Sequence, residues 1–176
     1  MNSSHRIITI ASLALMVFVL TLASPVLAAG ITAKALLPKA TAKAKKWQPD
    51  AALVHLGTEG AEPDGTVSAG PMSAGWDFTF VSPKTKKKIL VMVNPNGDVL
   101  QMDSNYFKDK AVGEFTMDSN KAMAAAVKNG LKTNNFGMKM RLEENQGRAE
   151  WRMLDDKFFY YVDANSGKVR KEKTID

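Results

Sequence analysis

Three places in this sequence carry residue types that can do chemistry, and the first is a loop near the C-terminus. Residues 163–167 read Asp-Ala-Asn-Ser-Gly and offer carboxylate and amide oxygens, the ligands that calcium prefers. An EF-hand loop also needs Gly at its sixth position and a bidentate Glu at its twelfth. Counted from Asp163, Gly167 is the fifth residue and Thr174 the twelfth, so the pattern fails. We predict a hairpin turn in which Gly167 takes a positive φ angle, with weak calcium binding by Asp163 and Asn165 as the alternative.

His55 and an adjacent pair of Asp residues are the other candidates for acid–base chemistry. His55 is the only His beyond the N-terminal apolar segment, and the chain has no Cys, so the usual zinc ligand sets are missing. We place His55 on a helix as a structural residue, because no carboxylate is marked to orient it as a base. Neighbours in a strand point to opposite faces, so Asp155 and Asp156 predict a turn between Leu154 and Lys157. We therefore assign no catalytic, cofactor-binding or metal-binding residues and expect a protein that is not an enzyme.

Two surface features could instead bind a partner. Residues 84–88 read Lys-Thr-Lys-Lys-Lys and predict the cationic tip of a hairpin, which can hold an acidic surface or remain a solvated loop. Four successive aromatic residues at 158–161 must place rings on both faces of their strand. One face builds the core, and the other can contact the rest of the chain or a partner. The candidate partner-binding residues are Lys84, Lys86, Lys87, Lys88 and Tyr161.

Residues 118–131 predict a helix followed by strands. Apolar side chains recur there at spacings of one, three and four residues, which is typical of a helix with one buried stripe. Asp118 or Ser119 can begin the helix by accepting a backbone N–H bond, and Gly130 suits its end. Residues 138–142 and 149–153 then alternate apolar with charged side chains, the period of a strand with one solvated face.

The first half of the chain predicts a similar unit. Its helix would lie at 49–56, with Pro49 in the first turn, and its strands at 76–80 and 89–93. Gly97 and Gly167 correspond at an offset of 70 residues, and the two helical stretches match at about the same offset, which indicates duplication of one unit. We predict an α+β fold of two repeats, each a helix packed on an antiparallel sheet of about three to four strands.

The second half resembles a PepSY-type domain. The likeness lies in "KAMAAAVKNG", in the strand that carries Trp151 and in the aromatic strand that runs into "VDANSGKV". The first half is similar to the same family through "PDAALVHL", "WDFTF" and "VNPNGDV", although "NPNGD" at 94–98 departs from the "DANSG" type of turn. The resemblance covers roughly residues 47–173. It implies an envelope or extracellular α+β module, found in propeptides of secreted metallopeptidases, with peptidase inhibition or regulation as its role and no catalytic residue.

The first 28 residues predict a secretory signal peptide. Arg6 precedes an apolar run and small residues follow it, so we expect cleavage after Ala28 and an exported protein, periplasmic or secreted. The alternative is an uncleaved membrane anchor, although the run from Ile7 to Leu22 is shorter than the roughly 17 to 25 residues that span a bilayer. Without Cys an exported chain forms no disulfides and must be held together by burial.

The net charge of +6 comes from the N-terminal part of the chain. Residues 29–46 contain Lys but no acid, whereas residues 48–176 hold as many acidic as basic residues. That neutral body argues against nucleic-acid binding. We predict a flexible or partly helical linker at 29–46, either solvated or weakly attracted to anionic membrane or wall polymer. The predicted domains are thus a signal peptide at 1–28, this linker, and PepSY-like repeats at 47–105 and 106–176.

These observations favour an exported binding module that is not an enzyme. It would act as a peptidase inhibitor or regulator, or hold another envelope or secreted protein or peptide. The alternative is a small-molecule or metal-ion sensor with a ligand between the two repeats. A hydrolase is the third possibility and would require His55 to be exposed beside two carboxylates in a pocket.

Overall fold

The computed structural model describes residues 30–69, 75–134 and 136–174. The predicted signal peptide and its cleavage site lie outside these residues. Within the part of the chain that is described, no helix is both long and apolar enough to cross a membrane.

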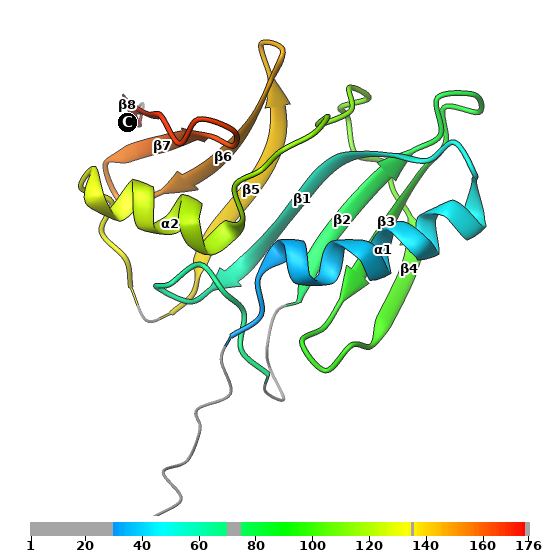
Figure 1. Ribbon diagram of the computed structural model, residues 1–176, viewed down its shortest axis with the longest axis horizontal. Coiled ribbons are helices and arrows are strands. Elements are labelled where there is room, and N and C mark those ends of the chain that lie inside the picture. The colour runs from blue at the N-terminus through cyan, green and yellow to red at the C-terminus, as the bar shows by residue number, and fades with distance from the viewer. Residues whose placement is uncertain (1–29, 70–74, 135, 175–176) are drawn as a thin grey trace, which may run out of the picture.

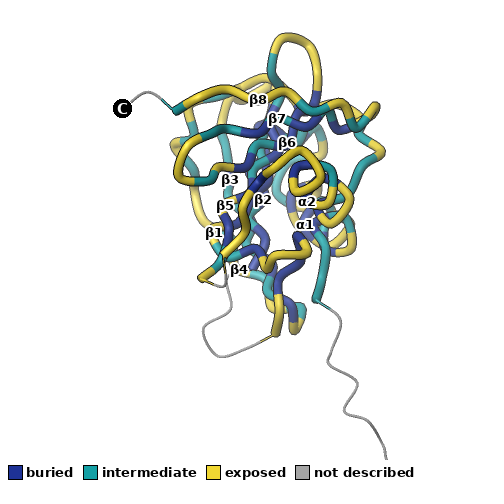
Figure 2. Tube along the Cα trace, turned by 90° about the vertical axis from the view of Figure 1, so that its left-hand side faces the viewer, coloured by how far each residue is buried: buried dark blue, intermediate teal, exposed yellow. Residues whose placement is uncertain are grey.

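Eight antiparallel strands form one continuous sheet, in the order β4-β3-β2-β1-β5-β6-β7-β8 (Figure 1). The strands are β1 (Ala52–Ala61), β2 (Trp76–Val81), β3 (Lys88–Val93), β4 (Val99–Asp103), β5 (Met138–Asn145), β6 (Arg148–Leu154), β7 (Phe158–Asp163) and β8 (Val169–Lys173). Two helices, α1 (Ala33–Trp47) and α2 (Ser119–Lys128), lie on the same face of this sheet (Figures 1 and 2).

The prediction of two repeats with separate sheets is wrong, because the two halves share one sheet. Strand β1 pairs with β5 in antiparallel register, with Leu56 opposite Leu142 and His55 opposite Glu143. An unpaired β1 would leave a row of backbone N–H and C=O groups without partners at a sheet edge. Pairing with β5 satisfies these groups, and among the described strands β4 and β8 form the two edges of the sheet.

The helix predicted at 49–56 is also wrong. Ala52–Ala61 form strand β1, in which buried Leu56 faces the core and His55 faces the other side, after an irregularity in the pairing between Leu53 and His55. The helix of the first half lies instead in the segment predicted as a linker. In α1, Ala33, Leu36, Ala40 and Ala44 recur at helical spacing and are buried against the sheet.

The second helix agrees with the prediction. Asp118 is the N-cap residue of α2, directly before its first residue, and its carboxylate accepts a hydrogen bond from the backbone N–H of Ser119. The same carboxylate accepts one from the N–H of Lys34 in the first turn of α1, so one side chain ties the two helix starts together. Gly130 follows α2 with a φ of 97°, the left-handed conformation expected of Gly there.

The core lies between the helices and the sheet. The face of the sheet under the helices carries large apolar side chains that are almost fully buried: Trp76, Phe78, Phe80, Ile89, Met140, Leu142, Trp151, Met153 and Tyr160. The small Ala side chains of both helices allow the helix backbones to lie close on these rings. Burial of this face supplies the hydrophobic stabilisation that a chain without disulfides requires.

The other face of the sheet is not covered by either helix (Figure 2). We call it the open face. Strand register and the period of two place on it His55, Gly57, Glu59, Asp77, Thr79, Leu90, Met92, Leu100, Met102, Arg141, Glu143, Glu150, Arg152, Tyr161 and Arg170. The connection from β4 to α2, residues 104–118, reaches this face at one end, where Tyr106 contacts His55 and Glu143.

Candidate functional site

A cavity of about 230 Å³ lies on the open face where the two halves of the sheet join. Its lining comes from β3, β2, β1 and β5, which are successive strands of the sheet, and from residues 104–106 of the β4–α2 connection. Asp77 and Arg141 lie opposite Gly57 on its two neighbouring strands.

Gly57 makes room for this cavity. It stands between His55 and Glu59 on the open side of β1 and carries no side chain. A Cβ at this position would lie 2.8 Å from the carbonyl oxygen of Met140 and 3.2 Å from Cε1 of His55. Any larger residue would therefore clash with the sheet and fill the cavity.

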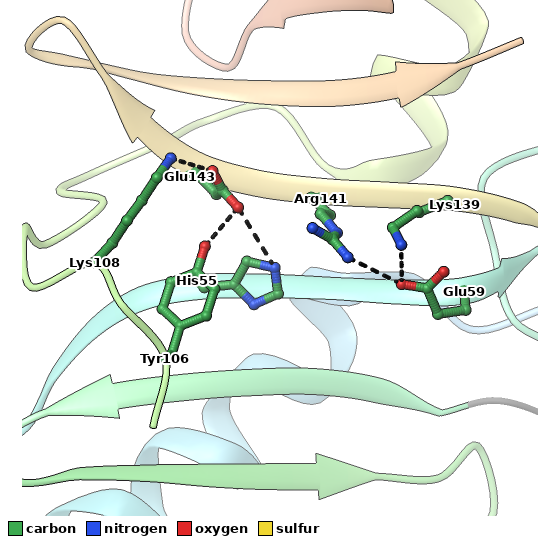
Figure 3. Close-up of polar contacts among 7 residues, drawn as sticks. All are labelled: His55, Glu59, Tyr106, Lys108, Lys139, Arg141 and Glu143. Carbon is green, nitrogen blue, oxygen red and sulfur yellow. Dashed lines mark hydrogen bonds and ion pairs between the residues drawn. The ribbon is translucent and has the colours of Figure 1, made fainter. Parts of the chain in front are cut away.

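One side of the cavity is a cluster of four polar residues (Figure 3). Nε2 of His55 lies 3.8 Å from Oε1 of Glu143 on the neighbouring strand. That same oxygen accepts a hydrogen bond of 2.5 Å from the hydroxyl of Tyr106, and Oε2 pairs with Lys108. The Tyr106 ring packs on the imidazole, with centroids 4.8 Å apart. The β4–α2 connection is thereby held against β1 and β5.

Burial determines the charge state of His55. It lowers the pKa of His55 from 6.5 to about 4, and the nearby Glu143 carboxylate only partly opposes this effect. Both imidazole nitrogens are buried and have no hydrogen-bond partner among the described residues. Burial acts to raise the pKa of Glu143, but the hydrogen bonds from Lys108 and Tyr106 outweigh it and hold that pKa below its usual value. The pair at neutral pH is thus a neutral imidazole beside an ionised carboxylate.

The opposite side of the cavity holds a second charged cluster (Figure 3). Oε1 of Glu59 accepts from Lys139 at 2.8 Å and from Arg141 at 3.2 Å. Partial burial acts to raise the pKa of Glu59, but these two hydrogen bonds outweigh it, and the pKa lies below its usual value. Both cations of this cluster therefore contact the one carboxylate, Glu59.

Asp77 differs from its neighbours because no cation compensates it. Its carboxylate lines the cavity and forms no hydrogen bond or ion pair with any residue that the structure describes. Burial, as the larger cause, and repulsion from Glu59, as the smaller, raise the pKa of Asp77 to about 6. A cation bound beside Asp77 would relieve both effects.

A second polar region of the open face lies around Tyr161. The Arg170 guanidinium stacks 4.0 Å from the centroid of the Tyr161 ring and pairs with Glu150 at 3.1 Å. Arg152 lies opposite Tyr161 on the neighbouring strand, and both line a smaller cavity of about 140 Å³. Tyr161 is thus on the open face as an aromatic surface residue, and its role in binding stays a prediction.

The predicted lysine tip forms as a turn between β2 and β3. Lys84, Lys86 and Lys87 are exposed there. Lys88 belongs to β3 instead, where its ammonium group donates to the carbonyl oxygen of Tyr106 and pairs with Asp109 at 2.5 Å. Lys88 is therefore occupied by the chain itself, and binding by the other three lysines stays a prediction.

The basic residues at 29–46 are also partly occupied. Lys34 donates to the carbonyl oxygens of Phe115 and Thr116, and Lys45 donates to that of Pro49. Lys39 contacts the carbonyl oxygen of Gly97 in the β3–β4 turn. This part of the chain therefore acts as a packed helix, and attraction to an anionic polymer remains a prediction for its other lysines.

Both carboxylate motifs near the C-terminus are turns, as predicted. The Asp163 carboxylate accepts from the backbone N–H groups of Asn165 and Ser166, and Gly167 has a φ of 74°. The Asp155 carboxylate accepts from the N–H groups of Lys157 and Phe158. These carboxylates therefore bond to backbone groups of their own turns, and weak calcium binding by Asp163 and Asn165 stays a prediction. Across the described ranges, no group of three or more His, Asp or Glu side chains is arranged to hold a metal ion.

His55 lies on a strand rather than on the helix predicted for it, and the neighbouring carboxylate of Glu143 was not identified from the sequence. These two residues are far apart in the chain and meet only through the β1–β5 pairing. Asp77, Tyr106 and Arg141 were missed for the same reason. The period of two in β5, which puts Lys139, Arg141 and Glu143 on one face, was the only available signal.

No protein-family model, curated protein or solved structure matches this chain. The arguments about function therefore depend on the geometry and chemistry of its own residues.

Proposed function

We propose that this chain is an exported binding module that is not an enzyme and that holds a protein or peptide partner on the open face. The observation that carries this proposal is the one-sided covering of the sheet. Both helices pack on one face of the eight-stranded sheet, and only the β4–α2 connection contacts part of the open face among the described residues (Figure 2). The solvated face of an antiparallel sheet normally carries polar side chains. Here, however, the apolar side chains of Leu100 and Met102 on β4 are 55% and 44% exposed.

The composition of the open face supports binding. Tyr and Arg are enriched in protein interfaces because they combine large contact area with directional hydrogen bonds. Tyr161, Arg152 and Arg170 lie together on β6, β7 and β8, while the exposed apolar residues lie on β4 at the other edge. Such a surface can contact an extended partner at two separate places.

The chemistry at His55 argues against a hydrolase. A general base must reach the proton that it removes, yet both nitrogens of His55 are buried. A single carboxylate, Glu143, faces the imidazole, and its own lone pairs are taken by Tyr106 and Lys108. The cluster therefore serves to hold the β4–α2 connection on the sheet.

Export and the partner class follow from the sequence. The pattern of the first 28 residues supports a signal peptide, and the resemblance to PepSY-type domains supports a secreted peptidase as the partner to be inhibited or regulated. An envelope protein of another kind is compatible with the same surface.

A capture experiment tests the proposal. The purified protein, immobilised, is exposed to envelope extract of the cells that produce it, with free protein as competitor, and retained proteins are identified by mass spectrometry. Met102→Asp should lower retention at least tenfold, because it places a charge in the apolar part of the open face. Val127→Asp is the matched control, since Val127 is also 44% exposed but lies on α2. Failure to find a saturable partner, or equal loss in both variants, would contradict the proposal.

A small-molecule or metal-ion sensor is the second candidate function, and the cavity between the halves is the observation that favours it. Its strand lining comes from β1, β2 and β3 of the first half and β5 of the second. A thermal-shift panel of small ligands and metal ions distinguishes the two functions, because a specific ligand in excess raises the unfolding temperature. A flat panel together with a saturable protein partner would favour the open-face binding module.

A further inference from the structure

We propose that the cavity at Gly57 is a subsite for a basic side chain, Lys or Arg, of the bound partner, and that the Asp77 carboxylate holds its charged group. This inference rests on the proposed function, because it specifies how the open face recognises its partner. The cavity, its lining and the charges around it provide the argument.

The space is suitable for one side chain. The cavity of about 230 Å³ is open to the face on which the partner would lie, and Gly57 forms its floor. Leu90 gives an apolar side on β3 against which a Lys or Arg stem can pack. The hydroxyl groups of Thr79 and Ser104, which also line the cavity, can accept hydrogen bonds from an ammonium or guanidinium group.

The charge balance selects a cation. Five ionisable groups surround the cavity on all sides: His55 and Glu59 on β1, Asp77 on β2, Arg141 on β5 and Tyr106 on the connection. His55 and Tyr106 are neutral at pH 7, while Arg141 and its neighbour on the open face, Lys139, both contact Glu59 and neither forms an ion pair with Asp77. Asp77 therefore leaves one negative charge without a partner among the described residues, and the internal residues that are not described, 70–74 and 135, contain no Lys or Arg.

The ionised Asp77 carboxylate lowers the stability of the folded protein, which indicates a role in binding rather than in folding. A half-buried carboxylate that no cation compensates destabilises the folded state in its ionised form, as the raised pKa of Asp77 indicates. An Asn would fit the same space without a charge. A partner cation would offset the cost at the moment of binding, because charge-assisted hydrogen bonds gain strength in a partly desolvated site.

Agmatine, which carries a guanidinium group on a short chain, is the probe for this subsite. It is titrated into the purified protein at pH 7 while NMR follows the ¹³C signal of the Asp77 carboxyl and the ring signals of His55. We expect saturable shifts of both, with a dissociation constant of about a millimolar for so small a ligand. Asp77→Asn should weaken binding at least tenfold, and Asp103→Asn should not. Asp103 is the matched control, since register places it on the other face of the sheet.

The pH dependence gives a second readout. Agmatine should bind the ionised form of Asp77, so the carboxyl should titrate at lower pH in its presence than in its absence. Binding should weaken by about tenfold for each pH unit below the midpoint of about 6. A role that is only structural would not produce this coupling.

Three results of the NMR measurements would overturn the inference. The wild-type protein could show no saturable shift with agmatine, Asp77→Asn could bind it as well as wild type, or Ca²⁺ alone could shift the signals. The capture experiment separates these failures from failure of the proposed function. A partner retained equally by wild type and Asp77→Asn leaves the function standing without the subsite. Agmatine binding without any captured partner leaves the subsite standing without the function.

Discussion

Trp76 and Trp151 meet edge to face beneath the two helices, with ring centroids 6.1 Å apart and planes inclined by 73°. They come from β2 and β6, which are separated in the sheet by β1 and β5. Each indole N–H donates to a carbonyl oxygen two residues before a helix begins: Trp76 to Ile31 at 3.0 Å and Trp151 to Met117 at 3.1 Å. The pair therefore joins the two halves of the core and fixes the start of each helix.

Replacing either Trp by Phe should destabilise the fold through the lost indole hydrogen bond. Each substitution leaves a carbonyl oxygen before a helix without its donor, which costs about 1–3 kcal/mol. A cycle with Leu in place of each Trp also removes the rings, and there the double variant should lose less than the sum of the singles, with a coupling of about 0.5–1.5 kcal/mol from the edge-to-face contact. Urea unfolding of the wild type and these variants measures the free energies. Strict additivity would show that the rings do not interact.

Ala40→Asp should unfold or severely destabilise the protein, by more than about 3 kcal/mol, because Ala40 is fully buried in α1 against the sheet. Lys43→Asp is the control at an exposed position of the same helix, and it should change stability by less than about 1 kcal/mol. Thermal unfolding followed by circular dichroism compares the two. If residues 29–46 were a free linker, neither substitution would change the unfolding temperature.

Asp77→Asn should stabilise the protein at pH 7 and have little effect at pH 4. The folded pKa of Asp77, about 6, lies above its ordinary value of 3.8, so the folded state binds more protons between these limits. The free energy of unfolding therefore falls as pH rises through this window, and the loss is complete above it. The gain at pH 7 should be about 1–2 kcal/mol, allowing for screening by solvent. Urea unfolding at both pH values checks it, and a destabilising effect at pH 7 would refute it.

His55→Gln should remove a loss of stability on acidification that the wild-type protein shows. The folded pKa of His55, about 4, lies below its ordinary value of 6.5, so the unfolded state binds more protons in between. The contribution of His55 to the free energy of unfolding is fully present above about pH 6.5, and it falls by about 2–3 kcal/mol as the pH drops to 4. Asp77 acts with the opposite sign over nearly the same range. The experiment is therefore best done in the Asp77→Asn background, where equal slopes with and without His55 would contradict the prediction.

The success of the sequence predictions depended on how local each feature was. Helix α2, strands β5 and β6 and the turn at Gly167 follow from patterns within a few residues of each other, and the structure confirms them. The helix predicted at 49–56 failed because a short apolar run has no unambiguous period. Helix α1 was missed because its buried stripe consists mostly of Ala within a Lys-rich segment, which resembles a solvated spacer.

The candidate site could not be predicted in the same way. His55, Asp77 and Arg141 are brought around Gly57 by two strand pairings, β1 with β2 and β1 with β5. The alternation within each strand indicates which residues share a face, but not which strands are neighbours. His55 was therefore assigned to the wrong element, and Glu143 was not recognised as its partner.

The sequence by itself determined the period of most strands, the second helix and the positions where Gly must turn the chain, because these depend on the local balance of side-chain burial and backbone conformation. The tertiary structure alone decided that the two halves share one sheet, that one face stays open and that a cavity with an uncompensated carboxylate lies at the join. The physical reason is that backbone hydrogen bonds at a strand edge can be satisfied by any strand of suitable register. The choice of β5 as the neighbour of β1 follows from packing of the whole core, including Trp76 on Trp151, and not from either strand alone.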